Sequence, residues 1–157
     1  MRVLIQRTPE AQDLPLPAYG SAGAAGLDLH AAVQNSLHLV PGQRTQVSTG
    51  IRVALPAGYE GQVRPRSGLA LRHGLAMVNA PGTIDADYRG VVSVILINLG
   101  QEAIVIQRGD RIAQLVVAPV TRVEWQEAVD ESLPETRRGL EGFGSTGTAM
   151  ELGGEHG

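Results

Sequence analysis

Short aliphatic runs, separated by turns that contain glycine or proline, limit this chain to a fold built from strands. The runs recur at a spacing of roughly ten residues, which is typical of an all-β sandwich or barrel. Only residues 67–73 look helical, with Ser67 as the expected N-cap. The predicted strands are residues 2–6, 27–32, 36–40, 44–49, 51–55, 59–64, 75–78, 91–98, 103–107, 111–118 and 121–125.

Composition indicates one domain with an aliphatic core. Hydrophobic residues make up 43% of the 157 residues, but aromatic residues only 3%. A chain of this length fits a single domain, which we place at residues 1–127. From about residue 128 the hydrophobic periodicity ends, and charged residues and glycines take over. Residues 128–157 are therefore predicted to form a flexible C-terminal arm.

Charge and residue usage argue against several classes of protein. The net charge is −3 and no basic stripe is present, so we expect no nucleic-acid partner. The longest apolar run, residues 91–97, is too short to span a bilayer, so no membrane association is expected. The chain has no cysteine, which excludes disulfides and thiolate metal sites and suits a cytoplasmic protein.

The most unusual segment, residues 79–90, combines a turn with a dense group of reactive side chains. Asn-Ala-Pro-Gly opens it, and Asp85, Asp87, Tyr88 and Arg89 then fall within five positions. An ordinary charged hairpin would explain the turn, but a hairpin needs only Asn, Gly or Asp at its bend. A ligand site is the alternative.

Three further motifs suit an anionic ligand. Arg66, followed by Ser67 and Gly68 at a helix start, would offer a guanidinium and free amides to phosphate, although a capped helix with a surface arginine is also possible. Asp28 is either a strand-edge acid or an acid that holds Mg²⁺ through its water shell. Gln114 lies in an aliphatic run, either on the wet face of the sheet or bonded to a ligand oxygen.

The last motif lies in the predicted arm. Residues 142–147 fit G-x-G-x-x-G, but no strand precedes them and ten residues follow them, so a dinucleotide-binding fingerprint is rejected. What remains is a glycine-rich segment preceded by Arg137 and Arg138. It carries Phe143, the single phenylalanine of the chain, whose simplest use is to stack on a flat ligand such as a base.

These five motifs, in this order, resemble those of the trimeric dUTPases. The resemblance covers residues 25–147. It implies a jelly-roll-like distorted β-barrel and a homotrimer with active sites shared between subunits. It also implies hydrolysis of dUTP to dUMP and pyrophosphate with Mg²⁺.

The resemblance also implies roles for single residues. Asp85 corresponds to the general base that activates water for attack on the α-phosphorus, while Tyr88 stacks under the deoxyribose. Asn79 and the backbone of the hairpin, Thr83 included, pair with the uracil edge. Asp28 holds Mg²⁺ through water. The phosphate contacts are assigned to Arg66, Ser67, Gly68 and Gln114, and, in the arm, to Arg138, Gly144, Ser145 and Thr146, with Phe143 over the uracil.

Two other functions, and a structural β-barrel without a ligand, are the alternatives. A dCTP deaminase shares the fold, but it carries a glutamate in the strand after the hairpin, where this chain has Ile95. A non-catalytic nucleotide-binding regulator would not need the carboxylate of Asp85. The sequence therefore favours hydrolysis.

Overall fold

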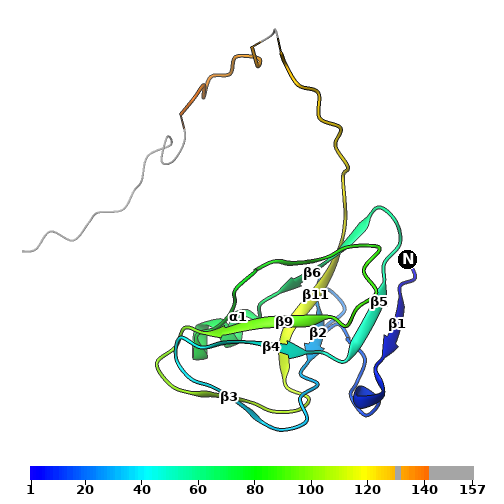
Figure 1. The fold of residues 1–157 in the computed structure, drawn as a ribbon, viewed down its shortest axis with the longest axis vertical. Coiled ribbons are helices and arrows are strands. Elements are labelled where there is room, and N and C mark those ends of the chain that lie inside the picture. The colour runs from blue at the N-terminus through cyan, green and yellow to red at the C-terminus, as the bar shows by residue number, and fades with distance from the viewer. Residues whose placement is uncertain (130–131, 142–157) are drawn as a thin grey trace, which may run out of the picture. The chain divides into compact units, whose positions relative to one another are not determined.

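The computed structural model describes residues 1–129 and 132–141, which belong to two compact units, Met1–Arg122 and Val123–Gly157. The first unit holds every helix and strand of the described residues (Figure 1). Its strands are β1 (Leu4–Arg7), β2 (Leu27–His30), β3 (Leu37–Leu39), β4 (Arg44–Ser48), β5 (Ile51–Ala54), β6 (Tyr59–Arg64), β7 (Leu75–Met77), β8 (Gly82–Ile84), β9 (Ser93–Asn98), β10 (Ile104–Ile106) and β11 (Arg111–Pro119). Its helices are the 3₁₀ helix η1 (Pro9–Ala11) and α1 (Ser67–His73).

The strands form four antiparallel sheets, as expected for an all-β fold. The largest has the order β2-β11-β6-β8, and a second has the order β4-β9-β7. Two-stranded sheets pair β1 with β5 and β3 with β10. The predicted all-β class with one short α-helix is confirmed, and α1 covers the predicted residues 67–73.

The core is aliphatic, as the low aromatic content requires. Leu29 and Leu115 from the four-stranded sheet join Val94 and Leu96 from the three-stranded sheet in one buried cluster. Val94 and Leu96 alternate with more exposed neighbours, so one face of β9 packs inward. Each such side chain contributes roughly 1.5–3 kcal/mol through burial.

Two local predictions are wrong. Residues 121–125 form no strand, because Val123 and Trp125 are exposed and no strand among the described residues pairs with them. Ser67 is the first residue of α1 and not its N-cap; Arg66 occupies the cap position without a side-chain capping bond. The backbone of Arg66 is extended there, and its side chain pairs with Asp28 and donates from Nη1 to the carbonyl of Arg111 at 3.2 Å.

The described part of the second unit contains no helix or strand. A turn at residues 136–141 is held by the amide of Gly139, which donates to Thr136 Oγ1, and by Arg138 Nε, which donates to the carbonyl of Glu141. The arm predicted at residues 128–157 stays a prediction. No α-helix of the described ranges is long and apolar enough to cross a membrane.

One arginine joins the N-terminal segment to the turn before β11. Arg108 makes a bidentate ion pair with Asp13, with N–O distances of 3.0 and 2.5 Å. The same guanidinium donates to the carbonyls of Glu10 at 2.6 Å and Val33 at 3.1 Å. Its hydrogen bonds hold the pKa of Asp13 below the ordinary value of 3.8. Arg108 therefore links the residues around η1 to the segment after β2.

Replacing Arg108 with alanine should lower the melting temperature by a few degrees at pH 7. Because the pKa of Asp13 is depressed in the folded state, this stabilisation is present above the unfolded pKa and is lost as pH falls through the folded value. Thermal unfolding of both proteins at pH 7 and about pH 3 checks this, since the difference should shrink in acid. Arg52→Ala, at an exposed arginine of β5, is the control. Equal melting temperatures at pH 7 would contradict the role.

Candidate active site

The segment from β7 to β9 encloses a small pocket of about 240 Å³, here called the hairpin pocket. Its apolar walls include Val63, Met77 and Ile95. The remaining lining comes largely from the predicted hairpin: Asn79, Gly82, Thr83, Ile84, Asp85 and Tyr88. A small cleft with apolar walls and a few polar groups suits a flat heterocycle.

A tight turn after β8 places Asp85 and Tyr88 together at this pocket. The amide of Tyr88 donates to the carbonyl of Asp85 at 3.1 Å. The side chain of Arg89 stabilises the turn, because its Nη1 donates to the carbonyls of Ala86 and Tyr88, each at 2.7 Å. The carboxylate of Asp85 is exposed at the pocket edge, where water can reach it.

A second group of predicted residues meets on the outer face of the four-stranded sheet. Arg66 Nε lies 3.1 Å from Asp28 Oδ1, and Arg111 Nη1 lies 3.2 Å from Asp28 Oδ2. Asp28 is mostly buried, with 18% of its side chain exposed, so water screens these pairs only partly. We call Asp28, Arg66 and Arg111 the Asp28 cluster.

The Asp28 cluster carries a net positive charge. His30, two residues beyond Asp28 on β2, has its Nδ1 buried without a hydrogen-bond partner among the described residues. Burial lowers the pKa of His30, the negative charge of Asp28 raises it, and the positive charges of Arg111 and Arg66 lower it further. The net effect is a lowered pKa, so the imidazole is neutral at pH 7. Two guanidinium groups against one carboxylate leave one positive charge, which suits an anionic ligand.

Gln114 and the start of α1 lie next to this cluster. Gln114 is paired with Asp28 across β2 and with Arg64 across β6, and its Nε2 donates to the carbonyl of Pro65 at 3.2 Å. Gly26 packs so closely against Gln114 Oε1 that a Cβ there would displace the Gln114 amide. At α1, the amides of residues 69 and 70 already bond to the carbonyl of residue 66, which leaves those of Ser67 and Gly68 available.

The hairpin pocket and the Asp28 cluster lie apart within one chain. Asp28 is on β2 and Asp85 follows β8, and these strands are opposite edges of the sheet. Three strand spacings of about 4.8 Å separate them by about 14 Å. β8 runs antiparallel to β6, with Gly82 opposite Val63 and Ile84 opposite Gly61. Asp85, which follows β8, therefore lies near the Tyr59 end of β6, whereas Arg66 follows the other end of that strand. Within one chain, Asp85 and Arg66 are therefore too far apart to contact the same ligand atom.

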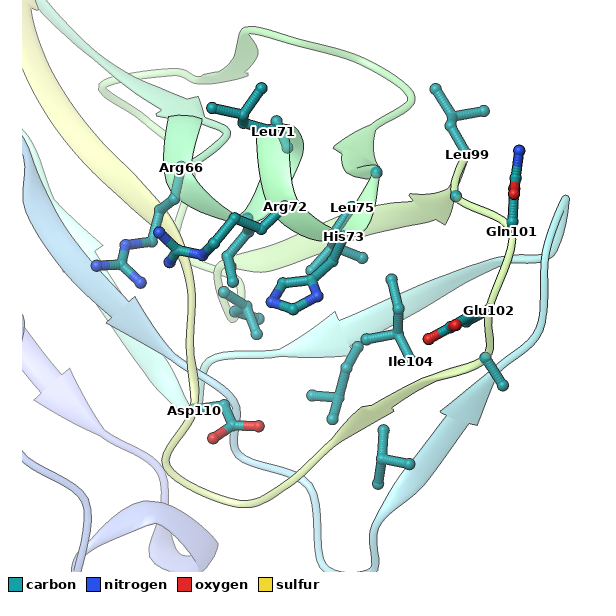
Figure 2. Close-up of a pocket in the computed structure, with 18 of the residues that line it drawn as sticks. Arg66, Leu71, Arg72, His73, Leu75, Leu99, Gln101, Glu102, Ile104 and Asp110 are labelled. Atoms are coloured by element: carbon teal, nitrogen blue, oxygen red, sulfur yellow. The ribbon is translucent and has the colours of Figure 1, made fainter.

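A larger hollow of about 990 Å³ lies beside α1. Figure 2 shows Arg66, Arg72 and His73 on one side of it, with Glu102 and Asp110 on other sides. Among the predicted site residues that the structure describes, only Arg66 lines this hollow, together with Arg111 of the Asp28 cluster, so the hollow adjoins that cluster and its size alone does not mark it as the site.

The described residues suit a metal ion that binds together with a phosphate ligand, and not one that is held by protein groups alone. Among the described residues, no three acidic, histidine or cysteine side chains gather as they would for a protein-held ion. Mg²⁺ usually keeps several waters and binds through one or two carboxylates together with phosphates. Asp28 Oδ2 accepts a hydrogen bond from Arg111 and Oδ1 is ion-paired with Arg66, which leaves lone pairs for metal-bound water.

Comparison with known families decides the assignment. The dUTPase family model matches residues 12–147, which is most of the chain. The chain belongs to the dUTPase family. The predicted family membership is thus confirmed.

Named relatives extend this match over nearly the whole length. The chain is 54% identical to the deoxyuridine 5'-triphosphate nucleotidohydrolase of Anaplasma marginale over 94% of this chain and 99% of that protein. It is 58% identical to the enzyme of the same name from Methylocella silvestris, over 92% and 91%. Among solved structures, the Staphylococcus bacteriophage 80alpha dUTPase with dUPNHPP is 26% identical, with a TM-score of 0.79, over 94% and 99%.

Within this dUTPase fold, the predicted site residues fall into three sets. The first set lines the hairpin pocket, the second lies around Asp28, and the third belongs to the predicted arm. Arg138 is in the second unit, and Phe143, Gly144, Ser145 and Thr146 lie outside the described residues.

Arg111 belongs to the Asp28 cluster, and the sequence prediction did not include it. It lies three positions before Gln114, so a regular strand would place the two on opposite faces. A register shift between Arg111 and Ala113 adds a residue to β11, so that Arg111 lies opposite His30 and its side chain donates to Asp28 on the face of Gln114. The signal was its place in the run Arg-Gly-Asp-Arg before Gln114.

Proposed function

We propose that the protein hydrolyses dUTP to dUMP and pyrophosphate by attack of an activated water on the α-phosphorus. The observation that carries this proposal is the placement of an exposed carboxylate, Asp85, at the edge of a base-sized pocket, on the same turn as Tyr88. Family membership and the names of the relatives support the substrate.

The hairpin pocket recognises the uracil base. Apolar walls contact its faces, while Asn79 and the backbone around Thr83 offer donors and acceptors to its edge. A pyrimidine with the wrong donors would leave buried polar groups unpaired, which costs far more than a lost contact. The methyl group of thymine would need additional space in a pocket of only about 240 Å³. Tyr88 lies under the deoxyribose.

The Asp28 cluster and the start of α1 bind the phosphates. Arg66 moves its fork of donors onto phosphate oxygens, aided by Gln114 and the amides of Ser67 and Gly68. Bound Mg²⁺, held by Asp28 through water, would neutralise charge on the triphosphate. Positive groups around the phosphates stabilise the charge that develops during attack.

Asp85 accepts a proton from water as the water oxygen bonds to the α-phosphorus. The bond from that phosphorus to the oxygen bridging to the β-phosphorus breaks. That oxygen keeps the electron pair and leaves as part of pyrophosphate, and dUMP remains. The exposed position of Asp85 lets a water occupy the space between carboxylate and substrate.

We propose that the active protein is a homotrimer with each site built from more than one chain. The support is geometric: Asp85 and the Asp28 cluster stand on opposite edges of one sheet, about 14 Å apart, which favours sites that combine these groups from two chains. Trimeric assembly is also what the resemblance to trimeric dUTPases implies.

The predicted C-terminal arm is the last part of the proposed site. Arg138 and residues 143–146 would close over the γ-phosphate, with Phe143 against the uracil. Such closure would exclude bulk water from the reacting phosphorus. We also propose a cytoplasmic location, which is where dUTP hydrolysis would act on a nucleotide pool.

A deaminase is the less favoured alternative. Ile95, at the position where a dCTP deaminase carries its glutamate, lines the hairpin pocket as an aliphatic wall. It has no group that can exchange a proton.

Product analysis with dUTP, dCTP, dTTP and UTP tests the function directly. We expect Mg²⁺-dependent pyrophosphate release from dUTP at a rate at least about a hundredfold above the others, because the pocket discriminates by unpaired polar groups and steric fit. Chelation by EDTA should remove most of the activity. Ammonia release from dCTP, without pyrophosphate, would point to the deaminase instead.

A further inference from the structure

The ring of Tyr88 folds back onto the backbone two residues ahead. Its hydroxyl donates to the carbonyl of Val91 at 3.1 Å. A Cβ at Gly90 would lie 2.5 Å from ring carbon Cζ and still closer to the hydroxyl oxygen. Real Cβ atoms essentially never approach other atoms within 3.0 Å. The observed place of the ring therefore requires glycine at position 90.

We propose that Gly90 is a positioning residue that sets the preference for deoxyribose over ribose by fixing the ring of Tyr88. This inference rests on the proposed function, in which Tyr88 lies under the sugar. Gly90 itself touches no substrate. It acts because the absence of a side chain lets the ring rest against the main chain.

A fixed ring discriminates better than a mobile one. Tyr88 lies at the mouth of the hairpin pocket with 42% of its surface exposed, so one side meets solvent or substrate while the hydroxyl end is anchored at Val91. A 2'-hydroxyl against aromatic carbon would lose its hydration without gaining a partner. A ring supported by the backbone cannot retreat to relieve that contact, whereas a displaced ring leaves room for water or for the hydroxyl.

Other hydrogen bonds stabilise the turn that carries Asp85. The Tyr88 amide bonds to the carbonyl of Asp85, and Arg89 bonds to the carbonyls of Ala86 and Tyr88. None of these contacts uses the Tyr88 ring. Displacement of the ring should therefore change sugar selectivity more than it changes turnover of dUTP.

The test is Gly90→Ala, with kcat/KM measured for dUTP and UTP. We expect the dUTP-to-UTP ratio to fall about tenfold or more, the range that one sterically matched group can supply. Gly23→Ala is the matched control, because Gly23 is exposed and a Cβ there would meet nothing within 4 Å. An unchanged ratio in a Gly90→Ala protein that melts like the wild type would overturn the inference.

A double-mutant cycle shows whether Gly90 acts through the ring. In a Tyr88→Ala background, Gly90→Ala should produce no further change in the ratio, since the group it displaces is gone. A persisting tenfold change would overturn the inference. Should Gly90→Ala fail to fold, Tyr88→Phe replaces it: loss of the bond to Val91 should reduce the ratio severalfold without altering the melting temperature, and an unchanged ratio overturns the inference. Wild-type protein inactive on dUTP would instead contradict the proposed function.

Discussion

Asp85→Asn should reduce kcat for dUTP by about a thousandfold, within the range that a positioned general base contributes. Asparagine keeps the size and the oxygen of the side chain but cannot take a proton from water. Binding of a non-hydrolysable dUTP analogue should change little, because the substitution keeps the shape of a side chain that lines the hairpin pocket. Steady-state kinetics and calorimetric titration with the analogue measure the two effects separately.

The matched control is Asp87→Asn. Asp87 lies two residues away on the same turn and is also exposed, but it does not line the hairpin pocket. Its replacement removes the same charge from the same region, so a purely electrostatic effect would appear in both variants. Wild-type turnover in Asp85→Asn, or an equal loss in both, would exclude Asp85 as the base.

Mixing two inactive variants should restore activity if each site uses more than one chain. Asp85→Asn lacks the base, and Arg66→Ala lacks a guanidinium of the Asp28 cluster. When the two proteins are refolded together in equal amounts, about a quarter of the sites in random trimers should combine an intact Asp85 with an intact Arg66. The recovered activity would exceed that of either parent by at least about tenfold, given the strength of a charge-assisted phosphate contact.

Wild-type protein refolded with the doubly substituted Asp85→Asn, Arg66→Ala chain controls for subunit exchange. Shared sites leave about a quarter of the positions intact in this mixture too, whereas sites contained in one chain leave about half. Activity of the first mixture that stays at the parental level, with exchange verified by light scattering of tagged chains, would show that the site is complete within one chain.

Residues that are close in sequence were the predictable part of the site. The turn from Asn79 to Tyr88 is local, so its side chains were expected together, and the structure places Asn79, Asp85 and Tyr88 around one pocket. Arg66 at the start of α1 was likewise found because Ser67 and Gly68 follow it directly. The catalytic and binding roles assigned to these residues remain predictions that the experiments above address.

Long-range geometry was not predictable in the same way. Arg111 was overlooked because strand alternation places it away from Gln114, and only the extra residue in β11 turns it toward Asp28. Residues 121–125 looked like a strand because Val123 and Trp125 alternate with polar residues, yet a strand also needs a partner for its backbone groups.

The amino-acid sequence alone determined the all-β class, the aliphatic core, the short helix at residues 67–73 and the dUTPase motifs, because these depend on local periodicity and on neighbouring residues. The tertiary structure decided three further features: the pairing of Asp28 with two arginines, the contact of the Tyr88 ring with Gly90, and the separation of Asp85 from the Asp28 cluster. The physical reason is that strand order, register and a single bulge fix which distant side chains share a face, and no local pattern encodes them.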